Sequence, residues 1–369
     1  MRDTIGIGLI GCGTVAGLRH MPALTGLPGA RVVALADPHS GSLERLGDRY
    51  EVRQRYADHE ALLQDPAVDV VAVLVPAARH AEILLAVLEA GKHVLVEKPL
   101  ALSMADADRM VERADRSTVK VSVGFNLRAH RLVRRARELL EQGIVGPIES
   151  IDGALFGDPG TTDDRWQGWR TNQRLGGGAL LEKGPHHYDL WRFLSGSEAI
   201  EVSAISQKSE AADRATVVSA RLESGALATT ALTEYGPALN RMTVLGPRGQ
   251  LELSVLEFDG LRFTPTSAFP GDARARLRAV RDFLRELPQG LRTMRQGGEY
   301  VASYRREWQL FLDAIQDGRP VHCGLEDGRR ALKISLAALS SAARGEAVRT
   351  EEVPSDPEAA LARPLESVE

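Results

Sequence analysis

A short apolar stretch that ends in two charges and a proline constrains the fold of this chain more than any other feature. Residues His93 to Val96 have the apolar, β-branched character of a buried strand, and Glu97, Lys98 and Pro99 follow at once. In an open parallel sheet, ligands bind outside the carboxyl ends of the strands. Lys98 at such a strand end is therefore predicted to meet a bound cofactor or substrate.

The N-terminal segment predicts a turn that binds a dinucleotide. An apolar run at Ile5–Ile10 is followed by a glycine-rich stretch at Gly11–Ala16 and then by a helical pattern that continues to Leu24. Glycines at such positions permit a tight turn and a close approach of the backbone to a pyrophosphate. The order strand, glycine turn and helix is the context that this interpretation requires.

An acidic residue at the end of the second predicted strand supports the same interpretation. The run Arg31–Ala36 ends at Asp37, and a carboxylate at this spacing accepts hydrogen bonds from an adenosine ribose. Pro38 and His39 come next, and no arginine stands beside the acid to bind a 2′-phosphate, so NAD is favoured over NADP. The alternative is an ordinary glycine turn next to a surface aspartate. Strand context, spacing and acid together favour the dinucleotide site.

Helices and strands alternate through the first third of the chain. Val68–Val75 is a continuous apolar run of the kind found in buried parallel strands, Glu82–Glu89 is a predicted helix, and Lys120–Phe125 is a further strand. Asp58 and Ser103 are predicted to cap helices. The pattern predicts a doubly wound parallel sheet, a Rossmann domain, over residues 1–125.

The second half of the chain contains strand-like runs that follow one another without helices between them. This order predicts an α+β domain over 126–353, built on an open, mainly antiparallel sheet, for substrate binding and oligomerisation. One sheet face could remain free and pair two copies into a homodimer or homotetramer. Residues 354–369 are predicted to be a loosely ordered tail. The runs are Ile148–Phe156, Ile200–Ser206, Thr216–Leu222, Leu227–Thr233, Met242–Leu245, Leu251–Val255 and Leu261–Thr264.

Composition excludes several classes of partner. The formal net charge of −4 gives no reason to expect nucleic acid or a membrane surface as a partner. Two cysteines, Cys12 and Cys323, lie far apart in sequence, which fits a reducing cytoplasm without disulfides. The segment Asp272–Arg295 is rich in arginine and carries an apolar stripe. A solvated basic face is the favoured interpretation of that segment, ahead of a lid or a contact helix.

A second polar motif lies in the segment from Gly176 to Asp189. Pro185 suits the first position of a helix, so His186 is predicted in the first turn, where the helix dipole disfavours an added positive charge. Asp189 then shares a face with His186. His186 and His187 could be structural histidines, metal ligands or, for His186, a general base. Zinc is disfavoured because neighbouring histidines point apart, and a general base is preferred because alcohol oxidation needs a proton acceptor.

Four segments together resemble the glucose–fructose oxidoreductase / inositol dehydrogenase (Gfo/Idh/MocA) family, and the resemblance covers nearly the whole chain. It implies Lys98 as the catalytic lysine, His186 as the acid/base and Asp189 as a nearby site residue. Glu182, the third predicted catalytic residue, is expected to orient one of the other two. Inositol dehydrogenase-like members have an aspartate at this position. The segments are Gly11–Gly13, Ala90–Pro99, Gly124–Asn126 and Gly178–Asp189.

Two sets of binding residues complete the prediction, and neither includes a metal ligand. The predicted cofactor-binding residues are Gly11, Gly13, Thr14, Val15, Asp37, Val75, Pro76, His80, Glu97, Lys98 and Asn126. The predicted substrate-binding residues are Lys98, Arg128, Trp169, Arg170, His186 and Asp189.

The resulting hypothesis is an NAD-dependent dehydrogenase that acts on a secondary hydroxyl of a sugar, an inositol or a related polyol. Two alternatives have the same fold. One is a glycosidase that uses NAD for a transient oxidation, and the other is a non-catalytic NAD-binding regulator. The loop from Asp158 to Arg174 is expected to decide the substrate, because loops of this kind vary most.

Overall fold

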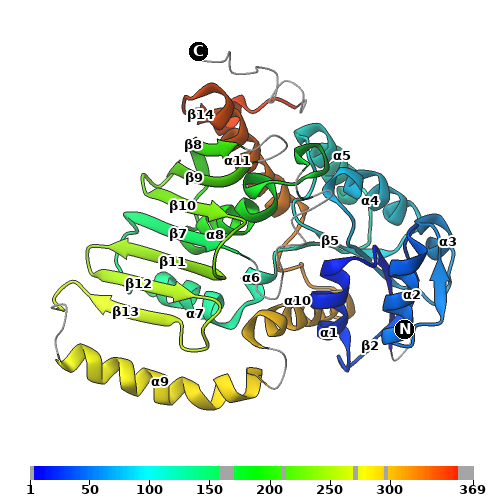
Figure 1. The fold of residues 1–369 in the computed structure, drawn as a ribbon, viewed down its shortest axis with the longest axis horizontal. Helices are drawn as coiled ribbons and strands as arrows, with labels where there is room; N and C mark the ends of the chain where they lie inside the picture. Colours follow the sequence, from blue (N-terminus) through cyan, green and yellow to red (C-terminus); the bar gives the residue numbers. More distant parts are fainter. Residues whose placement is uncertain are drawn as a thin grey trace. The chain divides into compact units, whose positions relative to one another are not determined.

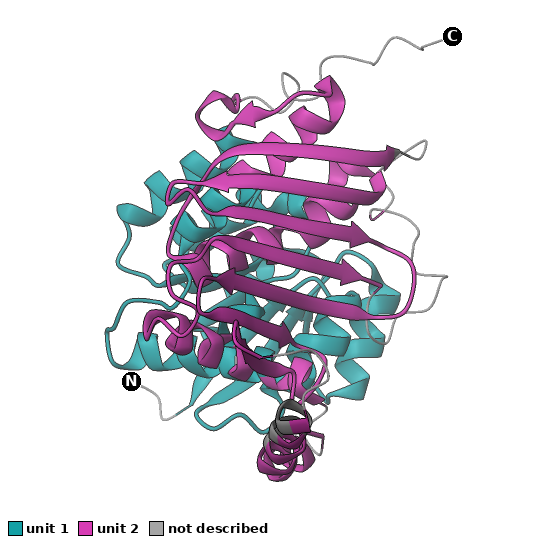
Figure 2. Ribbon diagram, turned by 90° about the vertical axis from the view of Figure 1, so that its left-hand side faces the viewer, with its two compact units in different colours: residues 1–129, 303–332 teal, residues 130–302, 333–369 magenta. Residues whose placement is uncertain are grey.

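The computed structural model describes residues 4–157, 170, 172–208, 213–268, 273–294 and 298–355. They form two compact units, which Figure 2 distinguishes by colour. Unit 1 comprises Met1–Ala129 and Ser303–Leu332, and unit 2 comprises His130–Ala302 and Lys333–Glu369. The sequence predicts contiguous domains at 1–125 and 126–353, whereas residues 303–332 belong to unit 1. Of the predicted tail at 354–369, residues 356–369 lie outside the described part of the chain.

Unit 1 is built on the predicted doubly wound sheet. Its six strands are all parallel, and β1 and β4 lie at the centre, where every residue is buried. Figure 1 shows these strands in blue to cyan. The strands in spatial order are β3 (Gln54–Tyr56), β2 (Ala30–Ala36), β1 (Ile5–Ile10), β4 (Val70–Val73), β5 (His93–Glu97) and β6 (Val121–Gly124).

The helices of unit 1 begin where local sequence signals predict. Asp58 accepts a hydrogen bond from the Ala61 amide at the start of α3, and Ser103 accepts one from the Asp106 amide at the start of α5. One element differs from expectation, since the segment after the glycine turn opens with the π-helical turn η1 (Ala16–His20) before α1. The helices are α1 (Met21–Leu24), α2 (Ser40–Arg49), α3 (His59–Leu63), η2 (Ala77–Arg79), α4 (His80–Glu89), α5 (Met104–Asp115) and α6 (Asn126–Ala129).

The C-terminal segment of unit 1 completes its core. Most of α10 (Gly298–Gln316) and the first residues of α11 (Leu325–Arg344) belong to this unit. The Val123 amide on β6 donates to the carbonyl oxygen of Cys323 at 3.1 Å, and the fully buried Trp308 donates to His20. Sequence analysis assigns both helices to the second domain, because amphipathic periodicity shows that a helix has an apolar face but not which sheet covers it.

Unit 2 contains the predicted mainly antiparallel sheet, with eight strands. Neighbouring strands are antiparallel except β7 and β10, which run parallel. The strands in spatial order are β13 (Leu261–Pro265), β12 (Gly249–Ser254), β11 (Leu239–Gly246), β7 (Ser150–Phe156), β10 (Leu227–Thr233), β9 (Asp213–Leu222), β8 (Ala199–Lys208) and β14 (Val348–Arg349).

The two faces of this sheet have different surroundings. Two helices of the unit, α7 (Arg131–Glu141) and α8 (Gly184–Ser195), pack on one face, where they contact β12, β7 and β10. The opposite face turns toward the viewer in Figure 2. There, Ile205 is paired across strands with Val217, and the two side chains are 82% and 51% exposed. Unit 2 therefore exposes an apolar pair on its open sheet face.

Helix α9 (Ala273–Met294), drawn in yellow in Figure 1, presents a second exposed apolar surface. Its inner side is attached to the rest of unit 2 by the ring of Phe283 against Phe258 and by an ion pair between Glu286 and Arg131 at 2.6 Å. The sequence predicts a solvated basic face for this segment, but apolar side chains are exposed as well. They are Leu277, Val280, Leu284, Leu291 and Met294. None of the described helices is long and apolar enough to cross a membrane.

Candidate active site

The glycine turn after β1 has the shape that a bound phosphate requires. Gly11 adopts a φ of +99°, and a Cβ there would lie 2.6 Å from the carbonyl oxygen of Leu74, so only glycine fits. A Cβ on Gly13, by contrast, would meet no heavy atom within 4 Å. Thr14 is exposed and Val15 is half-buried. The turn therefore has free space on the side of Gly13 where a pyrophosphate can approach the backbone.

Asp37 links this turn to the end of β2. Its Oδ2 accepts a hydrogen bond from the Cys12 amide at 2.7 Å, and its Oδ1 accepts one from the His39 amide at 2.8 Å. A carboxylate has about four lone-pair positions, so ribose hydroxyls can still donate to it. Burial, with the charge of Asp37 second, raises the pKa of the Cys12 thiol to about 12, which keeps that thiol protonated. This arrangement fits an adenosine ribose at Asp37.

His80 connects the ends of the next two strands. It is 1% exposed, and its ring nitrogens lie 2.9 Å from the carbonyl oxygen of Pro99 and 2.8 Å from that of Val75. Burial lowers the pKa of His80, and a neutral ring donates to only one of these two oxygens at a time. Val75 and Pro76 themselves are half-buried. His80 thereby holds the backbone at the strand ends where the cofactor is expected.

Lys98 follows a buried carboxylate that has two partners. Glu97 is 5% exposed, its Oε1 lies 2.9 Å from His20 Nε2, and its Oε2 accepts a hydrogen bond from the Lys98 amide at 3.1 Å. Burial acts to raise the pKa of Glu97, but the hydrogen bond from His20 and the electrostatic interactions with His20 and Lys98 outweigh it, so this pKa is lowered. The carboxylate is therefore ionised, and the Lys98 side chain is half-buried beside it.

Asn126 and Arg128 both lie on α6 and are both buried. The Asn126 amide donates to Ser303 Oγ at 2.8 Å, while its Oδ1 has no hydrogen-bond partner among the described residues. Arg128 pairs with Asp327 at 2.9 Å. An unpaired buried acceptor is destabilising, and a donor on a bound ligand would satisfy it. Together with the space at Gly13 and the carboxylate of Asp37, this acceptor fits a nicotinamide dinucleotide.

In unit 2, the predicted helix start near Pro185 is confirmed. The π-helical turn η6 (Ala179–Lys183) leads directly into α8, with Pro185 in its first turn. The carboxylate of Asp213 accepts a hydrogen bond from the Leu180 amide at 2.7 Å and so holds η6 against β9. His186 lies in the first turn of α8 and is 8% exposed.

The neighbouring His187 is the structural histidine of the pair. Its Nδ1 lies 2.8 Å from Thr230 Oγ1 and its Nε2 lies 3.1 Å from Asn240 Oδ1, so a single ring proton, on Nε2, serves both contacts. Burial lowers the pKa of His187 to about 4. A Cβ on Gly153 would lie 2.8 Å from this ring, which explains the glycine in the middle of β7.

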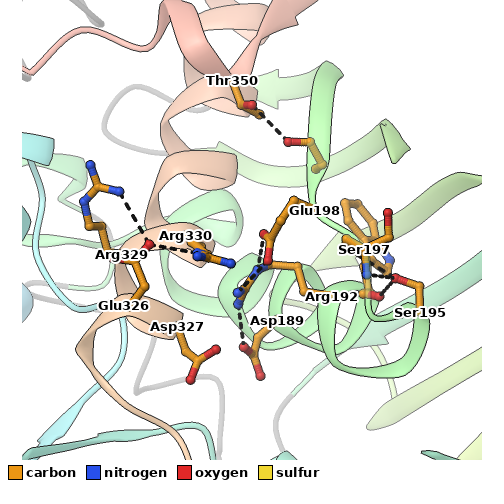
Figure 3. A network of polar contacts seen from close by, with 12 residues as sticks. Asp189, Arg192, Ser195, Ser197, Glu198, Glu326, Asp327, Arg329, Arg330 and Thr350 are labelled. Carbon is orange, nitrogen blue, oxygen red and sulfur yellow. Dashed lines mark hydrogen bonds and ion pairs between the residues drawn. The ribbon is translucent and has the colours of Figure 1, made fainter. Parts of the chain in front are cut away.

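Asp189 is part of a buried ion-pair chain. It is 1% exposed and lies 3.3 Å from Arg192, whose guanidinium also donates two hydrogen bonds to Glu198 at 2.6 and 3.0 Å. Figure 3 shows Arg192 between these two carboxylates. The contact with Arg192 anchors Asp189 one turn beyond His186 on α8, as the sequence spacing predicts.

Four ionisable side chains gather around η6. Arg170 Nε lies 3.3 Å from Glu182 Oε1, and Lys183 Nζ lies 3.5 Å from Glu234 Oε2. Burial, with the charge of Glu182 second, raises the pKa of Glu234 to about 8 against the opposing charges of Lys183 and Arg170. Glu234 is therefore mostly protonated at neutral pH. Trp169, which the sequence pairs with Arg170 in the predicted substrate loop, lies outside the described residues.

Sequence reasoning did not find Glu234, Lys183 or Asp213. Lys183 stands beside the predicted Glu182, but its partner Glu234 comes from the end of β10, 51 positions later in the sequence. The one local signal was Glu234 itself, a charged residue directly after the strand-like run Leu227–Thr233. Such a residue usually lies at a solvated strand end, and only the folded structure shows that the side chain of Glu234 is 5% exposed.

Two family models match the chain. An oxidoreductase family with an NAD-binding Rossmann fold matches residues 5–125, and the GFO/IDH/MocA C-terminal domain matches residues 133–252. The chain therefore belongs to the Gfo/Idh/MocA family of oxidoreductases, and it is a dehydrogenase that acts on CH–OH groups.

Individual relatives are similar to this chain over nearly its whole length. The chain is 30% identical to a myo-inositol 2-dehydrogenase of Thermotoga maritima over 363 residues, which are 94% of this chain and 99% of that protein. A probable dehydrogenase from Thermotoga maritima has a similar solved structure, with a TM-score of 0.74, 27% identity and coverage of 95% and 100% of the two chains. Levoglucosan dehydrogenase, solved with NADH and levoglucosan, shares the fold with a TM-score of 0.77 at 21% identity and coverage of 95% and 100%.

The raised pKa of Glu234 predicts how stability depends on pH. Between the ordinary carboxyl pKa of 4.5 and about 8, the folded chain retains a proton that the unfolded chain has lost, so stability falls as pH rises through this window. We expect Glu234→Gln to remove this contribution. The melting temperature of the wild type should then fall more between pH 5 and pH 9 than that of the variant. The difference should be about 2–4 °C for each kcal/mol that the protonated Glu234 contributes to the free energy of unfolding.

The matched control is Glu223→Gln on an exposed turn, which should leave the wild-type pH dependence intact. Equal slopes for the wild type and Glu234→Gln in differential scanning calorimetry would show that Glu234 is ionised in the folded protein at neutral pH.

Proposed function

We propose that the protein is an NAD-dependent dehydrogenase that oxidises a secondary hydroxyl, or reduces the corresponding ketone, of a sugar, an inositol or a related polyol. The observation that carries the proposal is the largely buried cluster of Arg170, Glu182, Lys183 and Glu234, in which Glu182 and Lys183 come from the turn that leads into the helix of His186. Carboxylates, cations and a protonated carboxyl group offer both acceptors and donors to a substrate with many hydroxyls. Relatives named for inositols and levoglucosan support this class of substrate.

Lys98 and His186 have separate roles in this proposal. The Lys98 ammonium donates a hydrogen bond to the reacting oxygen and stabilises negative charge on it. His186 accepts the hydroxyl proton, and returns it in the reverse direction. A bound nicotinamide supplies the hydride acceptor. Glu182 is proposed to orient one of these two groups, and its pairing with Arg170 limits the positions that its carboxylate can occupy.

The remaining predicted substrate contacts are proposed with the partners that the structure gives them. Arg128 is paired with Asp327 and Asp189 with Arg192, so these ion pairs would fix the positions from which the two side chains contact a substrate hydroxyl. Arg170 would contact the substrate from the edge of the loop that contains Trp169.

The proposed activity is tested by a panel of sugars, inositols and sugar nucleotides, read by formation of NADH. We expect at least one secondary alcohol to give net NADH. In Lys98→Met, turnover should fall severely while NAD binding stays intact, because the variant keeps the length of the side chain without its charge. In His186→Ala, turnover should fall by roughly 10² to 10⁴-fold because the base is removed.

Lys120→Met, a lysine at the opposite end of the sheet next to the start of β6, is the control and should retain turnover. Liberation of an alcohol from a glycoside without net NADH would identify the NAD-using glycosidase instead. NAD binding without turnover of any substrate would identify the non-catalytic regulator.

The choice of NAD over NADP is proposed on the charge of Asp37. This carboxylate would repel a 2′-phosphate, and Arg45, on the helix that follows, donates to Ser42. Asp37→Asn keeps an acceptor for the Cys12 amide but removes the charge. We expect the preference for NAD over NADP, measured by calorimetric titration, to fall by roughly tenfold, or about 1.4 kcal/mol. Tighter binding of NADP than NAD by the wild type would contradict the proposal.

A homodimer or homotetramer is proposed on the open sheet face of unit 2. The paired Ile205 and Val217 expose two large apolar side chains next to each other. Exposed apolar surfaces of this kind often mark interfaces with another protein chain. We expect light scattering to show an oligomer in the wild type and a smaller molar mass in Ile205→Arg. Leu284→Arg on the exposed stripe of α9 tests the other apolar surface and should keep the oligomer. Glu89→Arg on α4 is the control and should also keep it. A wild-type monomer at micromolar concentration would exclude the assembly.

A further inference from the structure

A chain of hydrogen bonds inside unit 1 leads from a tryptophan on α10 to the backbone of Lys98. Trp308 Nε1 donates to His20 Nδ1 at 3.1 Å, His20 Nε2 lies 2.9 Å from Glu97 Oε1, and Glu97 Oε2 accepts from the Lys98 amide at 3.1 Å. Trp308 and His20 are fully buried and Glu97 is 5% exposed. The chain joins three elements that are distant in sequence: α10, the π-helical turn η1 and the end of β5.

The chemistry of the donors fixes the tautomer of His20. An indole N–H can only donate, so the Nδ1 that it contacts must carry a lone pair. The single ring proton therefore lies on Nε2 and is donated to the ionised Glu97. The ring has no freedom to rotate, because Tyr304 meets it edge-on at 5.2 Å between ring centroids on one side and Trp308 meets it at 6.0 Å.

The position of Glu97 is restricted on its other side as well. A Cβ on Gly124 would lie 3.1 Å from the Glu97 carboxyl carbon, so the glycine at the end of β6 allows the carboxylate to lie close against the neighbouring strand. Nearby Glu307 is fully buried, and burial followed by the charge of Glu97 raises its pKa well above the usual range. Glu307 is therefore uncharged and leaves Glu97 as the one ionised carboxylate of this pair.

A buried carboxylate is expensive for a core that serves stability alone, because an ionised group loses its hydration there and must recover it in hydrogen bonds. The reason for this one is its second contact, since Glu97 Oε2 holds the amide of the very residue that carries the reacting ammonium. Orienting that peptide sets the direction in which the Lys98 side chain leaves the backbone. A displacement of 1 Å at a catalytic group can reduce rates by about 10²-fold.

We propose that Trp308 and His20 are positioning residues for Lys98, and that they act through Glu97 to hold the catalytic lysine at the end of β5. The proposal rests on the proposed function for the role of Lys98, but the hydrogen-bond chain itself does not depend on that role. The proposal gives a function to two elements of unit 1. One is α10, most of which belongs to this unit although it follows residues 130–302 in the sequence, and the other is the π-helical turn that places His20 beside β5.

The test compares two substitutions of similar size at His20. Gln can accept from Trp308 and donate to Glu97, whereas Leu can do neither. With a substrate from the panel, we expect His20→Gln to keep kcat within about threefold of the wild type and His20→Leu to lower it by roughly 10 to 10²-fold. The Kd for NAD and the KM for substrate should change by less than about twofold in both variants, because the side chain at position 20 is fully buried and is not proposed to contact a ligand.

Trp308→Phe removes the indole N–H together with part of the buried ring, and it should lower kcat in the same way as His20→Leu. The matched control is Trp191→Phe, because Trp191 is equally buried and its Nε1 has no hydrogen-bond partner among the described residues. The control should leave kcat unchanged. Equal losses of kcat in His20→Gln and His20→Leu would show that His20 contributes only packing and not hydrogen bonds. That result would overturn the proposal.

A second measurement does not require turnover. In protein labelled with ¹⁵N-lysine, the backbone amide resonance of Lys98, assigned with Lys98→Arg, should shift in His20→Leu and Trp308→Phe but stay in place in His20→Gln and Trp191→Phe. An unshifted resonance in His20→Leu would overturn the proposal even if the enzyme is active. A shifted resonance in a protein that oxidises no substrate would confirm the positioning chain and contradict the proposed function.

Discussion

Every ionised group that this protein buries must have a partner, and both units are arranged around that constraint. In unit 1, Glu97 is ionised between His20 and the Lys98 amide. In unit 2, Arg192 lies between two carboxylates, and Lys183 donates to the carbonyl oxygen of Gly157 and to Glu234. Charges without partners in a medium of low dielectric constant would be neutralised or would unfold the chain. The pairs therefore determine which polar groups can remain charged near the predicted catalytic residues.

The same constraint explains why two carboxyl groups of unit 2 differ in charge. Glu182 has Arg170 as a close partner, while Glu234 shares Lys183 with a backbone carbonyl and lies in the field of Glu182. Environments that push two neighbouring pKa values apart are a common way to assign donors and acceptors in an active site. Here they give one group that accepts hydrogen bonds and one that donates them.

Local patterns were sufficient to predict the fold of each unit, and the proline rule placed the start of α8. Strand context and spacing also led to Gly11, Asp37 and Lys98 as candidate site residues, and their roles stay predictions. The partners of these residues were not predictable, because His20 and Trp308, or Lys183 and Glu234, are brought together only by packing between distant segments. Helical periodicity also could not show that 303–332 belongs to unit 1, since an apolar stripe does not specify what it covers.

The return of residues 303–332 to unit 1 has a consequence for biosynthesis. A ribosome releases the first 129 residues long before the last segment of that unit exists. Until then, the β6 amide that pairs with Cys323 and the ring nitrogen of His20 that pairs with Trp308 lack their native partners. The N-terminal segment of unit 1 can collapse and form most of its sheet, but its core closes only after residues 130–302 of unit 2 have been synthesised in between. The sheet of unit 2 is therefore synthesised before the core of unit 1 can be completed.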